Sequence, residues 1–387
     1  MNVKELDGKY VANTYKRFPV EIVSGKGASL TDEAGKKYID MGAGIAVNTF
    51  GMADDEWIGA VTAQLAKFQH TSNLYYTEPC AKLAKMLCER TGMKNVFFSN
   101  SGAEANECAI KAAREYGITK KGEEYYNIIT LENSFHGRTM ATLSATGQAV
   151  FHEHFGPMLA GFIHTPANDC EALEKAVAEN KVCAIMFECV QGEGGVMPLT
   201  KEFVAKIFEL AKKYDLVTIA DEVQTGNGRT GKLYAYMNFD NIVPDIVSTA
   251  KGLAAGLPMG ATLFGEKTAD IYKPGMHGST FGGNPVCAAG AVNVISRLTE
   301  DFLSEVSAKA EYIKNALEGA KGIKTVSGMG LMIGLETEKE AAQVVAEAME
   351  RGVLLLTAKK KVRLLPPLSI TFEEIKKAVE VIKEVCA

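Results

Sequence analysis

Small polar residues follow the β-rich run NVFFS (95–99) and precede a helical pattern. They are Asn100, Ser101, Gly102 and Ala103. Small residues let the backbone approach an anion, and the free amides at a helix N-terminus favour phosphate. A serine before a helix is also a common N-cap, so an ordinary helix start would have the same sequence. The segment therefore predicts either a phosphate site or a plain cap.

An aromatic and a basic residue follow the run YNIITL (126–131). Phe135 and Arg138 lie in the loop ENSFHGRT (132–139). A phenylalanine can stack on a flat ring, and an arginine can bind a carboxylate through two parallel hydrogen bonds. A core phenylalanine beside a solvated arginine would produce the same sequence. Both interpretations of this loop stay open.

An acid and an amine end two further β-rich runs. LVTIAD (216–221) ends in Asp221, and a carboxylate there is costly unless it meets a cation or strong donors. This favours a catalytic or cofactor-binding role for Asp221. DIVSTA (245–250) is followed by Lys251 and Gly252. Desolvation lowers the pKa of such a lysine and makes it a candidate for a Schiff base, although a surface lysine could also end the strand.

The elements that must position these residues alternate between strands and helices. Two more β-rich runs, VCAIMFECV (182–190) and ATLFG (261–265), complete the set, and helical patterns such as 103–117 and 201–215 separate the runs. Continuous apolar strands separated by helices predict a mostly parallel sheet covered on both faces. Ligands bind at the carboxyl ends of such strands, so the four sets of residues should meet there.

The chemistry of the four sets together fits one cofactor, pyridoxal 5′-phosphate. Lys251 would bind the aldehyde, and Asp221 would pair with the pyridinium nitrogen. Phe135 would cover the ring face, and the amides after residue 100 would hold the phosphate. The sequence therefore predicts a site for pyridoxal 5′-phosphate at one edge of the sheet.

The two ends of the chain differ from its middle. Residues 20–41 have the pattern of a hairpin with glycine-rich turns, and amphipathic helices followed by short strands begin near residue 284. We therefore expect an α/β fold with three segments. Residues 46–283 form a large cofactor-binding domain, while residues 1–45 and 284–387 together form a smaller α+β domain.

Composition narrows the functional class. Acidic residues outnumber basic ones by 47 to 42 among the 387 residues, which argues against nucleic-acid binding. No apolar stretch approaches the roughly 20 residues of a membrane span, and the N-terminus lacks an apolar signal core. The eight cysteines form no CxxC pair, so we expect reduced thiols in a cytoplasmic protein. His152 and His154 lack a third ligand at useful spacing, and no metal site is expected.

Several longer motifs occur in a fixed order, and they extend over essentially the whole chain. The first two are the opening NTYKRFPV and the stretch GAGIAVN. The others are SNSGAEANE, SFHGRTMATLSATG, QGEGGV, DEVQTGNGRTG, AKGL, HGSTFGGNP and RLLPPL. The sequence resembles the class III (ornithine-type) aminotransferases of fold type I. Within that class it is most similar to the members that act on N-acetylornithine. The family depends on pyridoxal phosphate and has its active site at a homodimer interface.

The resemblance implies a role for each cofactor-binding position. Lys251 would be the residue that binds the cofactor aldehyde, and Asp221 the partner of the ring nitrogen. Phe135 and Val223 would cover the two ring faces. The remaining positions are Gln224 near the ring hydroxyl, Glu188 beside the cofactor, Ser101, Gly102 and Ala103 at the phosphate, and Thr280, reaching the phosphate from a second subunit.

The resemblance also implies how substrates bind. Arg138 matches the arginine that holds the distal carboxylate, with Tyr15 nearby. Arg363 matches the arginine for the α-carboxylate, and Glu193 matches the acid that covers Arg363 when no α-carboxylate is present. Such a site would move the δ-amino group of N-acetylornithine to 2-oxoglutarate, giving N-acetylglutamate 5-semialdehyde and glutamate in arginine biosynthesis.

Alternatives remain within and outside the class. Gly44 stands where ornithine enzymes tend to carry a tyrosine, which favours an acylated substrate but does not separate acetyl from succinyl. Within the class, the alternative amino donors are N-succinylornithine, ornithine and 4-aminobutyrate. Outside it, the alternatives are an aminomutase of the glutamate-1-semialdehyde type and a non-catalytic interaction protein. The run at 51–55 and the pair Glu188–Cys189 depart from the family pattern, and we expect both departures to alter only local packing.

Overall fold

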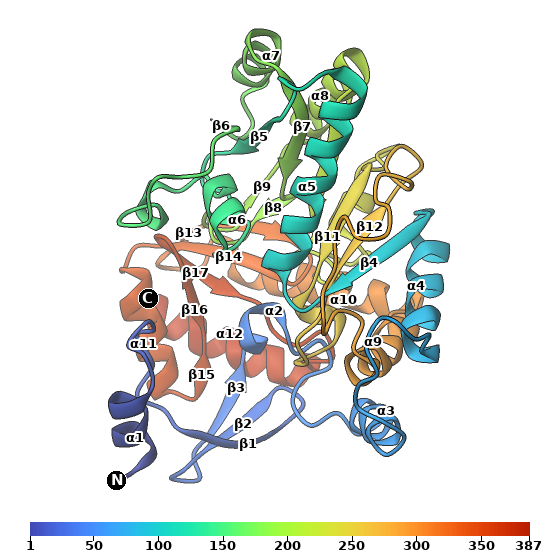
Figure 1. Cartoon of the computed structure of the whole chain (residues 1–387). Coiled ribbons are helices and arrows are strands. Elements are labelled where there is room, and N and C mark those ends of the chain that lie inside the picture. The colour runs from blue at the N-terminus through green and yellow to red at the C-terminus, as the bar shows by residue number, and fades with distance from the viewer.

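The largest sheet has seven strands, in the order β4-β12-β11-β10-β7-β5-β6, in a computed structural model that describes residues 1–387 (Figure 1). Neighbouring strands pair in parallel from β6 to β11, and β12 runs antiparallel to both β11 and β4. The predicted mostly parallel α/β sheet is confirmed. The strands are β4 (Asn95–Ser99), β5 (Asn127–Leu131), β6 (Phe162–Thr165), β7 (Val182–Phe187), β10 (Val217–Asp221), β11 (Ile246–Thr249) and β12 (Gly260–Phe264).

The reversed direction of β12 is the one departure from a parallel arrangement within this sheet. A parallel crossover needs a dozen or more residues, usually with a helix. The connection from β11 to β12 covers only residues 250–259, and its helical part is a single short turn. The short connection therefore returns the chain antiparallel. Lys251 lies at the start of this connection.

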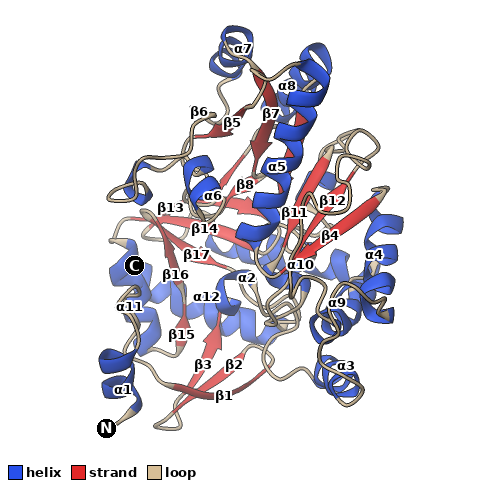
Figure 2. Ribbon diagram, viewed as in Figure 1, coloured by secondary structure: helices blue, strands red, loops and turns tan.

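Helices cover the sheet because their buried faces match its apolar strands. Helix α5 (Gly102–Lys121) packs against β7, β11 and β12 and buries small residues such as Ala105, Ala109 and Ala112, which allow close approach to the strands. Helix α8 (Lys201–Tyr214) packs on β7 and β10 and buries Phe203 and Ile207, as its amphipathic pattern predicted. Helices α6 (Met140–Ala145) and α7 (Cys170–Glu179) cover the β6 end of the sheet (Figure 2).

Two smaller sheets lie in the half of the molecule that also contains both chain termini (Figure 1). One has the order β1-β2-β3-β15, and the parallel pairing of β15 with β3 joins the two ends of the chain in one sheet. The other has the order β13-β14-β17-β16. The strands are β1 (Ile22–Lys26), β2 (Ser29–Asp32), β3 (Lys37–Asp40), β13 (Ile323–Met329), β14 (Met332–Thr337), β15 (Val353–Leu354), β16 (Leu356–Ala358) and β17 (Lys361–Leu364). The proposed domain boundaries stay a prediction.

The other helices and short strands complete the fold. Strand β6 and helix α11 are among the elements that the sequence analysis did not name; β6 is a short run that includes a histidine, and no side chain caps the start of α11. No helix combines the length and the apolar composition needed to cross a membrane. The elements are α1 (Val3–Tyr10), α2 (Ala43–Ala46), α3 (Asp55–Leu65), α4 (Glu78–Thr91), β8 (Val190–Gln191), β9 (Met197–Pro198), α9 (Pro285–Arg297), α10 (Glu300–Leu317), α11 (Ala341–Glu350) and α12 (Phe372–Cys386).

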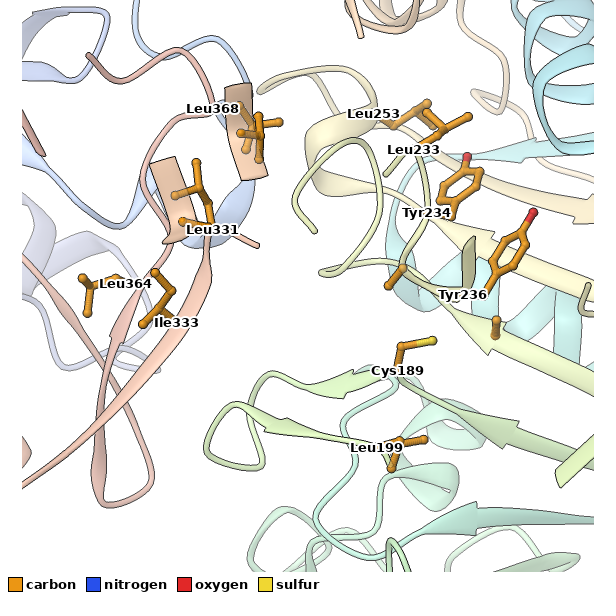
Figure 3. Close-up of a cluster of buried hydrophobic side chains, with 14 of the residues drawn as sticks. Cys189, Leu199, Leu233, Tyr234, Tyr236, Leu253, Leu331, Ile333, Leu364 and Leu368 are labelled. Carbon is orange, nitrogen blue, oxygen red and sulfur yellow. The ribbon is translucent and has the colours of Figure 1, made fainter. Parts of the chain in front are cut away.

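One apolar core connects the large sheet to the sheet of β13, β14, β17 and β16 (Figure 3). Tyr234 and Tyr236, from the loops after β10, belong to the same buried cluster as Ile333 and Leu364 on β14 and β17. Close packing of such a core transmits position, because a buried side chain has few alternative places to go. The core therefore sets the position of β17 relative to the loops at the carboxyl end of β10.

Candidate active site

A cavity of about 410 Å³ lies at the carboxyl ends of β5, β10 and β11 and at the start of α5. It is lined by residues from each of the four sequence segments that were predicted to carry chemistry. Its walls include Ser101 to Ala103, Phe135 to Arg138, Glu188, Asp221, Val223, Gln224 and Lys251. The parallel strands bring these segments together, because their carboxyl ends meet at the same edge of the sheet.

Asp221 is the last residue of β10 and is 3% exposed. Nδ1 of His136 and Nδ2 of Asn106 each lie 2.8 Å from its Oδ2, and the amide of Val223 donates to Oδ1 at 3.0 Å. These contacts orient the carboxylate at the cavity wall. The sequence did not identify His136 or Asn106. The only available signal was that His136 follows Phe135 in the candidate loop and that Asn106 lies one turn inside α5.

Lys251 begins the short turn after β11 and has a left-handed φ of 47°. This conformation is unfavourable for a residue with a side chain, and such strain is concentrated at functional sites. The carbonyl of the next residue, Gly252, accepts a hydrogen bond from Thr49 Oγ1 at 2.8 Å, which holds the turn. Burial lowers the pKa of Lys251 to about 8, so much more of the amine is in its neutral, nucleophilic form near neutral pH.

The start of α5 forms the wall that can receive an anion. Ser101 is the N-cap, and its Oγ accepts the amide of Glu104 at 3.2 Å. The amides of Gly102 and Ala103 occupy the first turn, where no intrahelical acceptor exists, and they line the cavity. A Cβ on Gly102 would lie 2.6 Å from a methyl group of Val223. Ser101 is therefore a helix cap, as one interpretation of this segment expected, and the phosphate site stays a prediction.

A buried arginine and an acid meet beside the cavity. Arg363 on β17 is 3% exposed, and its Nη1 donates to Glu193 Oε1 at 2.5 Å and to Gln224 Oε1 at 3.1 Å. Gln224 Nε2 also donates to Glu193 Oε1, at 3.2 Å. Burial acts to raise the pKa of Glu193, but the adjacent guanidinium outweighs it and lowers the pKa overall. Glu193 therefore stays ionised and neutralises Arg363.

Glu188 is a second acid in the cavity wall, and it binds the loop that follows β5. The amide of Phe135 donates to Glu188 Oε1 at 2.9 Å, and burial raises the pKa of Glu188. The guanidinium of Arg138 lies 4.2 Å from the ring centre of Phe151 and 5.5 Å from that of Phe135. Arg138 is exposed, so its charge is available at the mouth of the cavity.

Four predicted site residues do not line the cavity of this chain. Glu193 and Arg363 lie beside it, against Gln224 of its wall. Tyr15 is 71% exposed, and the guanidinium of Arg17 lies 5.5 Å from its ring centre. Thr280 is exposed in the segment 279–282. That segment is tied to the start of α5, because Asn100 Nδ2 donates to Ser279 Oγ at 3.1 Å.

The comparison with known families gives a match along nearly the whole chain. The family model described as aminotransferase class-III matches residues 10–386. An acetylornithine aminotransferase from Haemophilus ducreyi is 50% identical over 385 residues, which cover 99% of this chain and 98% of that protein.

Solved structures show the same fold. An ornithine aminotransferase from Toxoplasma gondii is 32% identical with a TM-score of 0.94, covers 99% of this chain and 93% of its own, and is described with partial occupancy of PLP at its active site. An N-acetylornithine aminotransferase from Stenotrophomonas maltophilia is 33% identical with a TM-score of 0.84, and the match covers 98% of this chain and 97% of that one.

Proposed function

Because this chain belongs to the class-III aminotransferase family, we propose that it transfers the δ-amino group of N-acetylornithine to 2-oxoglutarate. The products are N-acetylglutamate 5-semialdehyde and glutamate, and the reaction is a step in arginine biosynthesis. The observation that carries this substrate assignment is the 50% identity, over nearly full length, to an acetylornithine aminotransferase. Enzymes of this class use pyridoxal 5′-phosphate.

The residues of the cavity fit pyridoxal phosphate. They combine a buried amine on Lys251, a carboxylate on Asp221 and free amides at the start of α5 in one volume of about 410 Å³. His136 Nε2 and Asn106 Oδ1 are buried without hydrogen-bond partners close to that carboxylate, so the polar groups around it are not all satisfied by the protein. When bound, the cofactor supplies an aldehyde for the amino group and a ring that accepts electrons from the neighbouring carbon.

Lys251 would serve first as the attachment point and then as the base. Its amine would hold the cofactor aldehyde in the resting enzyme. After the amino group of the substrate takes its place, Lys251 Nζ would accept the proton from the substrate carbon that bears the nitrogen and would return it within the same half-reaction. Because the amine is released beside the reacting carbon, proximity contributes more than basicity. The lowered pKa leaves more of the amine neutral near pH 7 than in an ordinary lysine.

Asp221 would hold a proton at the ring nitrogen. Its Oδ2 is oriented by His136 and Asn106, so the carboxylate cannot rotate away from the cavity. Phe135 and Val223 would lie on the two faces of the ring, with Gln224 near the ring hydroxyl and Glu188 beside the ring. The amides after Ser101 would bind the phosphate, as helix N-termini commonly do.

The two substrates place their carboxylates differently, and Arg363 with Glu193 would accommodate both. N-acetylornithine presents its δ-amine, so its α-carboxylate lies far from the reacting carbon, towards Arg138, with Tyr15 nearby. Glutamate presents its α-amine, so one carboxylate must pair with Arg363. We infer that Glu193 covers Arg363 during the first half-reaction and moves aside for glutamate. The present contact of 2.5 Å supports the covered state.

Ornithine is the second candidate for the amino donor, since the Toxoplasma ornithine aminotransferase has the higher TM-score of the two solved structures. Gly44 favours the acylated substrate. It has a left-handed φ of 64°, and a Cβ there would lie 3.2 Å from Asn48 Nδ2. Gly44 is not among the residues that line the cavity, so its preference for an acylated donor rests on the family resemblance, in which ornithine enzymes tend to carry a tyrosine at this position. N-succinylornithine and 4-aminobutyrate are further donors that the test below separates.

We also propose a homodimer in the cytoplasm, with Thr280 completing the phosphate site of the partner. Large apolar side chains are exposed near this segment, among them Leu74, Tyr76 and Phe281. Asn73 Nδ2 donates to the carbonyls of Ser279 and Gly282, at 2.9 and 2.8 Å, so the exposed residues and Thr280 share one surface. Burial of this surface against a second copy would remove the apolar area from water.

The test of the proposed function is a panel of first half-reactions. The purified holoenzyme is mixed with N-acetylornithine, N-succinylornithine, ornithine or 4-aminobutyrate, and loss of the absorbance band of the bound cofactor is followed in a stopped-flow instrument. We expect the highest kcat/KM for N-acetylornithine. A higher value for another donor would replace the substrate assignment. A colourless protein that binds no cofactor would overturn the enzyme assignment itself.

A further inference from the structure

Arg229 is a buried cation for which the proposed reaction has no use. It belongs to the motif DEVQTGNGRTG (221–231), is 2% exposed and forms no ion pair within 4.0 Å, and the buried carboxylate of Asp40 acts on its charge only from farther away. Burying a charge is costly unless hydrogen bonds replace its water. Nη1 of Arg229 donates to the carbonyls of Leu331 at 3.1 Å and Pro366 at 2.5 Å. A residue kept at such a cost is expected to hold these two carbonyls in place.

The two carbonyls flank the strands that carry Arg363. Leu331 directly precedes β14, and Pro366 follows the end of β17 by two residues. Within the pair, Gly334 of β14 is opposite Arg363 of β17. The amide of Leu331 donates in turn to the carbonyl of Arg229 at 2.9 Å. Leu331 and Leu364, labelled in Figure 3, belong to the same buried apolar cluster as Tyr234. Arg229 therefore fixes one end of the β14–β17 pair.

Other groups hold the same segment from different sides. Lys309 Nζ donates to the carbonyl of Leu368 at 3.0 Å. Two amides of the segment also donate to backbone carbonyls near the N-terminus: Leu365 to Met41 at 2.6 Å, and Leu368 to Thr49 at 2.8 Å. None of these contacts comes from the loop that follows β10. Arg229 is the side chain that connects that loop to the segment after β17.

The loop after β10 thus contacts Arg363 directly through one residue and holds the backbone near it through another. Gln224 accepts a hydrogen bond from the guanidinium of Arg363 at 3.1 Å, and Arg229 holds the backbone beyond the strand that bears it. We propose that Arg229 is a positioning residue that sets the location of Arg363, and thereby the affinity of the site for the carboxylate beside the reacting carbon. This inference rests on the proposed function, because it assigns that carboxylate to Arg363.

Arginine is the residue type that this role needs. A single nitrogen, Nη1, donates to both carbonyls, and the rigid planar guanidinium fixes the directions of its two N–H bonds. A lysine has a similar reach and the same charge, but its ammonium rotates on a flexible stem. Arg229→Lys therefore keeps the buried charge and loosens the link between the two carbonyls.

The test compares the two half-reactions of the holoenzyme. For Arg229→Lys we expect the KM for 2-oxoglutarate and the inhibition constant of glutarate, a dicarboxylate without an amino group, to rise by about tenfold. This is less than the roughly hundredfold loss that a 1 Å misplacement can cause, because the charge stays in place. The kcat/KM of the amino donor should change by less than about twofold. An equal loss in both half-reactions would contradict the proposal.

A matched control is available in Arg90→Lys. The guanidinium of Arg90 also donates to two backbone carbonyls, those of Ile295 at 2.7 Å and Leu298 at 2.5 Å, at the end of α9. We expect this variant to lower the melting temperature without changing the inhibition constant of glutarate. A change like that of Arg229→Lys would show a general effect of loosened packing and would overturn the proposal.

A double mutant separates positioning from structure. If Arg229 acts through Arg363, the effect of Arg229→Lys on glutarate should disappear in an Arg363→Ala background, since coupled residues are not additive. A full additional loss in that background would refute the proposal. Arg229→Gln, which keeps one donor group, is the second variant if Arg229→Lys does not fold. Failure of both to fold while Arg90→Lys folds would assign Arg229 to overall stability and overturn the inference.

The outcomes also distinguish this inference from the proposed function. The wild-type panel of amino donors tests N-acetylornithine as the substrate, and another preferred donor can take its place in the comparison. The affinity for glutarate tests Arg229 whichever donor is preferred. Failure of one result therefore leaves the other measurable.

Discussion

Replacing Glu193 with alanine should change the balance between the two substrates of the enzyme. Arg363 is 3% exposed and has Glu193 at 2.5 Å as its charged partner, while the side chain of Glu193 is 28% exposed. Removing one member of a buried charge pair costs about 2–5 kcal/mol. Because Glu193 is partly exposed and Gln224 still accepts a hydrogen bond from Arg363, the lower end of about 2 kcal/mol is appropriate.

This free energy acts in opposite directions on the two half-reactions. N-acetylornithine meets an uncovered cation and loses rate, whereas glutamate no longer competes with an internal carboxylate for Arg363. Each 1.4 kcal/mol is about tenfold, so the ratio of the two kcat/KM values should shift by tenfold or more towards glutamate. Arg363→Ala should instead damage the glutamate half-reaction most.

The assay is single-turnover kinetics of the holoenzyme with N-acetylornithine and with glutamate, measured separately. Glu193→Gln is the matched control, because it keeps the size and hydrogen bonding of the side chain without its charge, and we expect a shift smaller than that of Glu193→Ala. If Glu193→Ala lowers both half-reactions by the same factor, Glu193 does not alternate between two states and has a structural or general catalytic role.

Three other outcomes are expected. Lys251→Ala should abolish turnover while circular dichroism shows an unchanged fold; repeated turnover at near-normal rate without an added amine would refute the role of Lys251. Asp221→Asn should bind the cofactor but slow proton abstraction by about tenfold to a hundredfold, because hydrogen bonds to charged groups contribute about 1.5–3 kcal/mol. A loss below about threefold in the acetylornithine half-reaction would contradict the role of Asp221. Because burial lowers the pKa of Lys251 to about 8, the apoenzyme should capture pyridoxal phosphate faster as the pH rises and level off above about pH 8, and a rate that keeps rising towards pH 10.5 would refute the lowered pKa.

Local pattern was sufficient to identify most strands of the large sheet. VCAIMF is buried along its entire length in β7, and a continuous apolar run of this kind is typical of a strand covered on both faces. The placement of Asp221 and Lys251 at strand ends was also predictable, because the strand boundaries and the residue types are both local properties. The antiparallel direction of β12 was not inferred, although the connection before it is too short for a parallel crossover.

The contacts around these residues were decided by the tertiary structure. His136 and Asn106 meet Asp221 from 85 and 115 residues away, and no local pattern distinguishes this histidine from one in an ordinary loop. Glu193 and Arg363 lie 170 residues apart and were paired from family resemblance, not from their spacing. The two carbonyls that Arg229 holds are 102 and 137 residues away. A sequence specifies which groups can donate, accept or carry charge, but long-range pairing depends on how sheets and helices pack, and that packing alone brought these groups within hydrogen-bond distance.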